Sequence, residues 1–245
     1  MRASAAFLLA LLTAIAQAGQ AYGQHDHMRE PAPKPIAARY QTQASDSAGR
    51  ALGDNEWYFW RDANRIETVR PAAGLAEIWE RDERGQVTLT RVFRNDRRLV
   101  EYLPRELKAL RIEPSWEVLG TVIDRHNLDA LKRVRTVRLS HGTATVFRGD
   151  VDGQSMQVWW LEEHALPARI ERRTREGRFL LTLKSVHPRP PAGWPRSTEA
   201  ELGEYLRIDA ADFGDMAYDP FVQKVERLDA LTGVLGSAAH AHHAH

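Results

Sequence analysis

Histidine is the residue type with the clearest capacity for chemistry in this chain, because neutral imidazole is the commonest transition-metal ligand in proteins. Six of the ten histidines lie near the two ends of the sequence: His25, His27, His240, His242, His243 and His245. A dense His tract is typical of metal binding, so we predict a site for Ni²⁺, Cu²⁺ or Zn²⁺ in the His-rich tail, 237–245. The alternatives are an expression tag or a chance polar tail, although tags are normally unbroken and Ala interrupts this tract.

The other polar clusters favour structural roles. Four histidines are expected at turns or helix ends, where they would be structural or exposed: His126, His141, His164 and His187. Glu162-Glu163 beside His164 could form an acid–base group, but the predicted turn favours exposure to solvent. A further cluster is acidic and consists of Asp209, Asp212, Asp215 and Asp219. It lacks the alternate-residue spacing of a calcium loop, so we interpret it as turn and capping chemistry.

The sequence contains none of the common catalytic motifs. The chain has no Cys and therefore no thiol nucleophile. It also has no Gly-x-Ser-x-Gly elbow, no His-Glu-x-x-His zinc motif and no phosphate-binding loop. The formal net charge of +1 over 245 residues argues against a nucleic-acid binder held by bulk electrostatics. We predict a protein that is not an enzyme and does not bind nucleic acid.

The first residues indicate export. Arg2 gives a positive start, and the apolar run over 5–15 is too short to span a bilayer as a stable helix. Small residues then fit the signal-peptidase cleavage rule, so we predict a signal peptide over 1–23 with the cut between Ala18 and Gly23. No second apolar run follows, so we expect a periplasmic protein with no transmembrane segment in its mature chain.

The middle of the chain has the rhythm of an antiparallel sheet. After a flexible, Pro-rich lead-in at 24–36, short strands separated by turns run through 37–188. In one of them, apolar residues share a face with Arg91 and alternate with Thr88, Thr90 and Arg94. This period of two indicates a half-buried strand. We predict a mainly β (α+β) protein built on one large curved antiparallel sheet of about ten to eleven strands.

Helices are expected in two places. Over 115–134 the strand rhythm stops, Ser115 is suited to cap a helix, and apolar residues follow at helical spacing. Because this insert must bury its apolar side, we expect it on the concave face of the sheet. A C-terminal helical extension is predicted over 189–236. It opens on the capping box Thr198-Glu-Ala-Glu201 and contains a second helix start at Asp219-Pro220.

The stretch over 154–186 reads as three antiparallel strands joined by tight turns. It contains Val158-Trp159 and, after an acidic turn, Leu166-Pro167. In these features the chain resembles the outer-membrane lipoprotein-carrier-like half-barrel superfamily, which includes sigma-factor-regulator ectodomains and mycobacterial lipid-binding lipoproteins. The resemblance covers roughly 37–188. It implies an incomplete barrel that wraps short helices and leaves an apolar cavity, but the C-terminal helices and the His tail lie outside its pattern.

The resemblance and the tryptophan content suggest which residues could line such a cavity. Our candidates are apolar residues on the predicted strands and insert: Trp60, Trp79, Leu119, Ile123, Val158 and Trp160. Simple core packing is the alternative role for the tryptophans. Trp159 and Trp160 are neighbours on a strand and must point to opposite faces, so at most one of them faces the cavity.

Three functions remain in competition. The first is a non-enzymatic periplasmic protein that binds an apolar ligand or a lipidated partner in the half-barrel. The second is a metal-handling accessory protein that uses the His-rich termini. The third is an envelope-sensing domain that docks on a membrane-protein partner.

Overall fold

The computed structural model describes residues 34–238, apart from 113–114, 124 and 152. The first half of this range contains six strands: β1 (Ile36–Asp46), β2 (Ala51–Arg61), β3 (Arg65–Arg70), β4 (Leu75–Arg81), β5 (Val87–Phe93) and β6 (Arg98–Tyr102). The second half contains another six: β7 (Lys132–Leu139), β8 (Gly142–Val151), β9 (Gln154–Leu161), β10 (Leu166–Arg173), β11 (Gly177–His187) and β12 (Leu206–Asp209). The predicted signal peptide and the His-rich tail lie outside the described residues.

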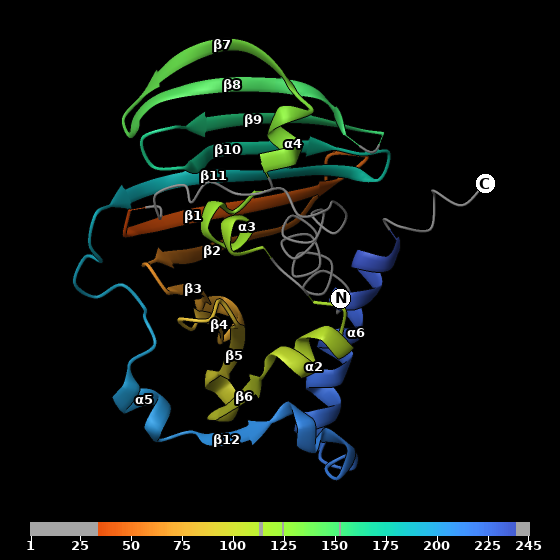
Figure 1. The fold of residues 1–245 in the computed structure, drawn as a ribbon. Coiled ribbons are helices and arrows are strands. Elements are labelled where there is room, and N and C mark those ends of the chain that lie inside the picture. Colours follow the sequence, from red (N-terminus) through yellow and green to blue (C-terminus); the bar gives the residue numbers. More distant parts are fainter. Residues whose placement is uncertain (1–33, 113–114, 124, 152, 239–245) are drawn as a thin grey trace.

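All twelve described strands belong to one open sheet, in the order β12-β6-β5-β4-β3-β2-β1-β11-β10-β9-β8-β7. Each of the first six strands pairs antiparallel with its neighbour in sequence, and so does each of the next five. The antiparallel pairing of β1 with β11 joins these two meanders, and the sheet curves strongly between them (Figure 1). The predicted mainly β class and curved half-barrel are therefore confirmed.

The twelfth strand was not predicted, because its residues fall within the expected helical extension. Leu206–Asp209 pairs with β6 in parallel, with Ile208 opposite Val100. Four residues are too few for a periodic signal, and only the free edge of β6 makes this segment a strand.

Five described helices accompany the sheet: α2 (Pro104–Ala109), α3 (Trp116–Thr121), α4 (Arg125–Asp129), α5 (Glu199–Gly203) and α6 (Pro220–Ala238). Three short 3₁₀ turns are η1 (Pro71–Ala73), η2 (Arg94–Asp96) and η3 (Ala210–Gly214). The helical insert begins earlier than expected, because Pro104 occupies the first turn of α2, where its missing N–H is not needed. It also ends earlier, because β7 already begins at Lys132.

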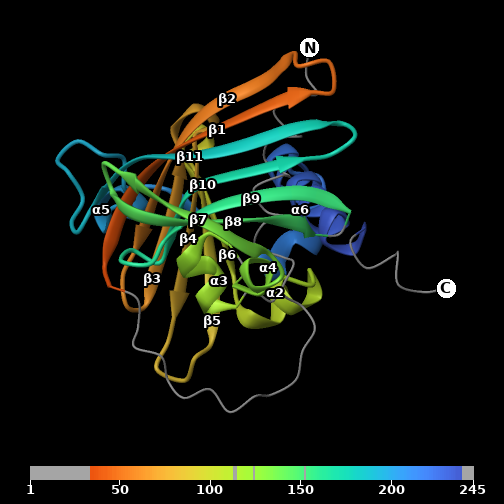
Figure 2. The same cartoon turned by 90° about the horizontal axis from the view of Figure 1, so that it is seen from above.

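Alternating side chains along the strands divide the core into two parts. On β5, Leu89 and Phe93 join the larger cluster, which contains the apolar residues of α2, α4 and the start of α6. Val92 belongs to a smaller cluster on the other face, which Trp194 and Leu202 cover. Most of the larger cluster lies on the concave face. Figure 2 shows α5 and the segment before it on the opposite side of the sheet from α2, α3, α4 and α6.

The C-terminal segment crosses from the outer face to the concave face. On the outer face the Thr198 side chain accepts a hydrogen bond from the Glu201 N–H at 3.1 Å, which confirms the capping box of α5. The chain then forms β12 at the edge of the sheet. Asp219 accepts from the Phe221 N–H at 2.7 Å at the start of α6, which packs against β5 and β6. Among the described helices, none has the length and apolar character needed to span a membrane.

Candidate functional site

The concave face is a continuous apolar surface to which both meanders contribute. At its centre Tyr40 on β1 and Trp57 on β2 stack with their ring centroids 4.8 Å apart. The Tyr40 hydroxyl donates to the Pro167 carbonyl at 3.0 Å, and Trp57 Nε1 donates to Thr42 Oγ1 at 2.9 Å. Burial raises the pKa of Tyr40 far above its usual range, so the phenol stays neutral. Because these polar atoms are satisfied within the sheet, the rings can pack as apolar surfaces.

Short helices cover this face. Gly120 of α3 lies so close to β2 that a Cβ there would be 3.3 Å from Arg61 Cδ. Leu131, just after α4, lies over Gly149 of β8, where a Cβ would be 3.1 Å from its side chain. Ile123 between the two helices is completely buried in the concave core. The expectation that the insert lies on the concave face is therefore confirmed.

The connection between α3 and α4 is conformationally strained. Val122 ends α3 with φ at 66° and ψ at −15°. A β-branched residue in this left-handed region is an outlier that costs on the order of 1–3 kcal/mol. Moreover, α3 and α4 have only six and five residues, and helices this short depend on tertiary packing for their stability. The helices that cover the concave face therefore depend on their contacts with the sheet for stability.

Arg61 holds α3 to the sheet without a carboxylate partner among the described residues. Its guanidinium donates to the carbonyl oxygens of Gly120 at 2.6 Å, His164 at 2.8 Å and Ala165 at 3.4 Å. Its Nε and Nη2 also donate to the Lys34 carbonyl, at 3.2 and 3.1 Å. Burial lowers the pKa of Arg61 to about 10, so the side chain is still charged at neutral pH. One cation therefore joins the end of β2 to α3 and to the turn between β9 and β10.

A buried ion network fastens α6 at the other end of the concave face. Arg91 on β5 bonds Glu77 on β4, with Nε 3.1 Å from Oε1, and also pairs with Asp229 on α6. The Tyr102 hydroxyl donates to Asp229 Oδ2 at 3.0 Å. Burial alone would raise the pKa of Glu77, but Arg70 and Arg91 outweigh it and lower that pKa. Since removing one partner would leave a buried charge unpaired, this network holds α6 in place.

The candidate cavity residues do not all share one face. Trp79, Ile123, Val158 and Trp160 are buried in the concave core, and Leu119 is half-buried against it. Trp60 belongs instead to the outer cluster, so its assignment to the cavity was wrong. Its neighbours on β2 explain this, because Trp57 and Phe59 face the concave side and the alternation sends Trp60 outward. The structure adds Tyr40, Trp57 and Arg61, which sequence reasoning missed.

The same alternation decides which of the two neighbouring tryptophans on β9 faces the concave side. Met156 is directly opposite Gly149, which lies under Leu131 on the concave side, and opposite residues share a face. Trp160 is four residues from Met156 and therefore faces the concave side. Trp159 faces outward, where Arg169 lies over its ring at 5.5 Å.

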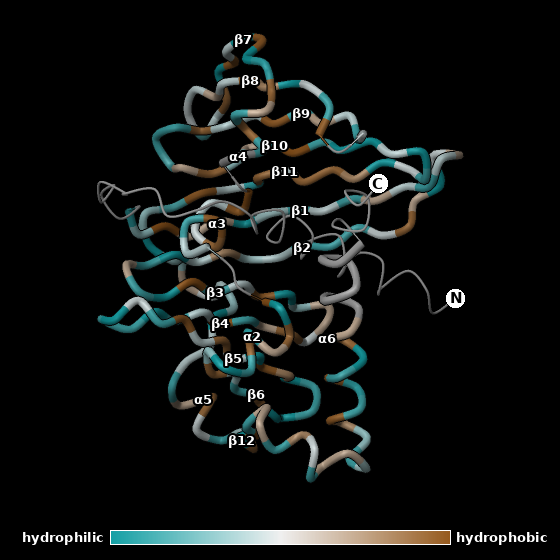
Figure 3. The backbone as a smooth tube through the Cα atoms, turned by 45° about the vertical axis from the view of Figure 1, so that its right-hand side comes forward, coloured by the Kyte–Doolittle hydropathy of each residue, from teal (hydrophilic) through white to brown (hydrophobic). Residues whose placement is uncertain are grey.

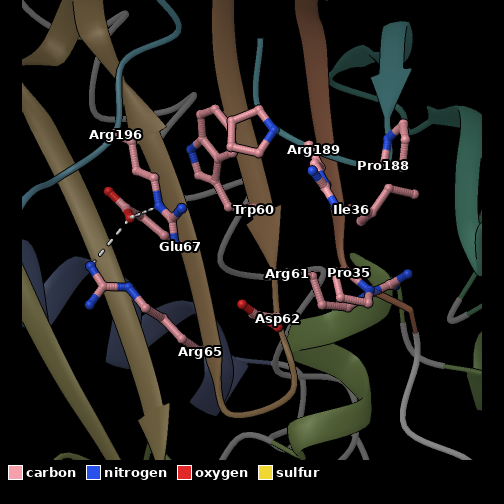
Figure 4. A pocket seen from close by; sticks show the side chains of 11 residues that line it. Pro35, Ile36, Trp60, Arg61, Asp62, Arg65, Glu67, Pro188, Arg189 and Arg196 are labelled. Atoms are coloured by element: carbon pink, nitrogen blue, oxygen red, sulfur yellow. Dashed lines mark hydrogen bonds and ion pairs between the residues drawn. The ribbon is translucent and has the colours of Figure 1, made fainter. Parts of the chain in front are cut away.

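A small pocket of about 150 Å³ lies outside the concave core, near the end of β2. Trp60, Arg189 and Arg196 line it, and Figure 4 shows Arg65 and Arg196 on either side of the Glu67 carboxylate. Glu67 Oε2 is 3.4 Å from Arg65 and 3.9 Å from Arg196. The charged lining makes this pocket unsuited to an acyl chain.

No group of three or more His, Cys, Asp or Glu side chains in the described part of the chain could hold a metal ion. The six histidines proposed as ligands all lie outside that part. His164 Nε2 is 3.1 Å from the His141 carbonyl oxygen, and His187 packs edge-on against Trp194. In the acidic cluster, Asp209 caps η3 and Asp219 caps α6, which agrees with turn and capping chemistry.

Comparison with known proteins gives similarity in structure only. No family model matches the chain, and no curated protein does. PNGF-II is 12% identical with a TM-score of 0.43, over 76% of this chain and 33% of PNGF-II. MucB is 11% identical with a TM-score of 0.41, over 84% of this chain and 66% of MucB. A putative outer membrane lipoprotein-sorting protein domain from Vibrio parahaemolyticus is 10% identical with a TM-score of 0.29, over 69% of this chain and 89% of that domain.

These neighbours include the two kinds of protein, lipoprotein-sorting domains and sigma-factor regulators, to which the sequence resemblance points. The match spans a third of PNGF-II and just under two thirds of MucB. Because every one of these TM-scores is below 0.5, the similarities carry no argument about what this chain does.

Proposed function

We propose that this chain is a periplasmic, non-enzymatic binding domain that holds an apolar chain against its concave face. The ligand is either a free lipid or the acyl group of a lipidated protein partner. The observation that carries the proposal is the contrast between a broad apolar sheet face and its strained cover at Val122. Moving α3 and α4 outward would expose Trp79, Val158 and Trp160 without breaking any strand pairing.

The hydropathy of the strands agrees with this view. Figure 3 shows brown, apolar stretches along β9, β10 and β11, beside the region where α3 and α4 lie. Helices this short depend on tertiary packing for their stability, so moving them outward would give up the burial of residues such as Ile123. An acyl chain in their place would regain the lost burial at about 0.8 kcal/mol per CH₂ group.

Neighbouring tryptophans on opposite faces provide a matched test. A brominated fatty acid quenches the fluorescence of tryptophans that it contacts, so it should quench the wild-type protein. Trp160→Phe should remove part of this quenching, whereas Trp159→Phe should leave the quenched component intact. A clean apo mass in native mass spectrometry together with no quenching would contradict the proposal, as would a loss of quenching only in Trp159→Phe.

Metal handling by the terminal histidines stays a separate proposal, which rests on their composition alone. Deleting 238–245 should abolish retention on a Ni²⁺ or Cu²⁺ column and leave acyl binding unchanged. Equally tight metal binding by the truncated protein would show that the tail is not the site. An envelope-sensing role, in which the domain docks on a membrane-protein partner, is compatible with acyl binding and with metal binding.

A further inference from the structure

The edge strand β7 is strongly basic. It carries Lys132, Arg133, Arg135 and Arg138, and Arg148 lies beside it on β8. All five side chains belong to exposed residues, and none forms a hydrogen bond or ion pair with another described residue. One long side of β7 pairs with β8, while the other is a free edge of the sheet within the described part of the chain.

Several arginines elsewhere on the sheet, in contrast, form ion pairs with carboxylates. Glu171 on β10 pairs with Arg169, Arg173 and Arg178. At the opposite edge, Arg207 of β12 pairs with Glu101 of β6. At β7, by contrast, Lys132 stands directly opposite Arg148. Like charges at opposite positions destabilise a strand pair, so this charge arrangement does not serve the pairing of β7 with β8.

The cations lie on both faces of the edge. Arg133 is opposite Phe147 and Arg138 is opposite Thr143, and these two positions on β8 share one face. Lys132 and Arg135, opposite Arg148 and Val146, share the other face. A flat anionic surface would meet the cations of one face only. An extended chain added beside β7 would place alternate side chains over both faces.

From this geometry we propose that β7 binds an acidic polypeptide segment in extended conformation, which adds to the sheet as a further strand. Strand addition uses the free N–H and C=O groups of an edge for affinity and the flanking side chains for specificity. The pairing of β7 with β8 is irregular between Arg133 and Arg135, so the partner pairs with the regular stretch Arg135–Leu139. Carboxylates of the partner then meet Arg133 and Arg138 on one face and Arg135 on the other.

The simplest test uses a fluorescent peptide of about ten residues, enough for one strand, with consecutive glutamates placing carboxylates on both faces. Fluorescence anisotropy should show binding that weakens as salt increases. Arg135→Gln combined with Arg138→Gln should weaken binding about tenfold or more. Arg84→Gln combined with Arg175→Gln removes two exposed charges from turns and should leave affinity unchanged. Hydrogen exchange should slow at amides within Arg135–Leu139 when the peptide binds.

Two further probes decide what kind of binding this is. A peptide of the same sequence with alternate backbone nitrogens methylated keeps its charge but cannot pair as a strand, so it should not bind. Equal affinity for the methylated peptide would overturn strand addition. Vesicles of anionic phosphatidylglycerol that bind in place of the peptide would also overturn it. If the unmodified peptide fails to bind as well, the cations only protect the edge from aggregation, and the proposal is wrong.

Discussion

Arg91 on β5 and Asp229 on α6 form a buried ion pair although 138 residues separate them along the chain. The pair connects the fifth strand of the first meander to α6, the last of the described helices. Because both side chains are almost completely removed from solvent, their mutual attraction is only weakly screened. The docking of α6 on the concave face therefore depends on this contact as well as on apolar packing.

Removing the cation should destabilise the protein. Arg91→Leu leaves the buried Glu77 and Asp229 carboxylates without their shared partner, so the free energy of unfolding at pH 7 should fall by about 3–5 kcal/mol. Arg50→Leu removes an arginine that is 80% exposed and paired with Asp46, and it should cost less than about 1 kcal/mol. Chemical denaturation measures both changes. Equal losses in the two variants would show that the buried network does not fasten α6.

One glycine at the junction between the two meanders should not tolerate a larger side chain. A Cβ on Gly177 would lie 2.0 Å from the Ser45 carbonyl oxygen, where β11 begins its pairing with β1. Gly177→Ala must therefore move one backbone away from the other, and we expect a loss of at least about 2 kcal/mol in unfolding free energy. Gly203→Ala in α5 is the control, because nothing lies within 4 Å of its Cβ position. It should be neutral or slightly stabilising.

Two apolar residues of the insert should differ in their contribution to stability. Ile123→Ala truncates a fully buried side chain and should cost about 2–5 kcal/mol. Leu119 is half-buried, so Leu119→Ala should cost clearly less, on the order of 1 kcal/mol. Thermal melts compare the two variants directly. If neither melt changed, the packing of the insert on the concave face would be wrong.

Acid should remove one specific contribution to stability. Burial alone would raise the pKa of Glu171, but hydrogen bonds from Arg169, Arg178 and Arg173 outweigh it and lower the pKa to about 2. Its usual value is 4.5, so the stabilisation is fully present above pH 4.5 and is lost as the pH falls toward 2.

Glu171→Gln should therefore be less stable than the wild type at pH 7, by about 1–2 kcal/mol after allowance for the partly exposed arginines. The difference should shrink as the pH decreases below 4.5. Glu162→Gln, in an exposed turn, should show no such pH dependence. Urea denaturation across this pH range measures both variants, and a constant difference for Glu171→Gln would rule out the ion cluster as its cause.

The sequence by itself determined the local elements. A period of two predicted the strands of both meanders, and it correctly placed Leu89, Phe93 and Arg91 on one face of β5. Capping chemistry located the starts of α5 at Thr198 and of α6 at Asp219. These features depend on residues within a few positions of one another, so a single chain segment contains the whole signal.

Only the tertiary structure decided which face became the concave one. Alternation shows that Trp57 and Trp60 point to opposite sides of β2, but it does not show which side the helices will cover. That choice depends on the direction in which the sheet curves and on contacts between distant segments, such as Arg61 with Gly120. The conversion of Leu206–Asp209 into a strand likewise required the free edge of β6. These outcomes are cooperative, and no local pattern of residues contains them.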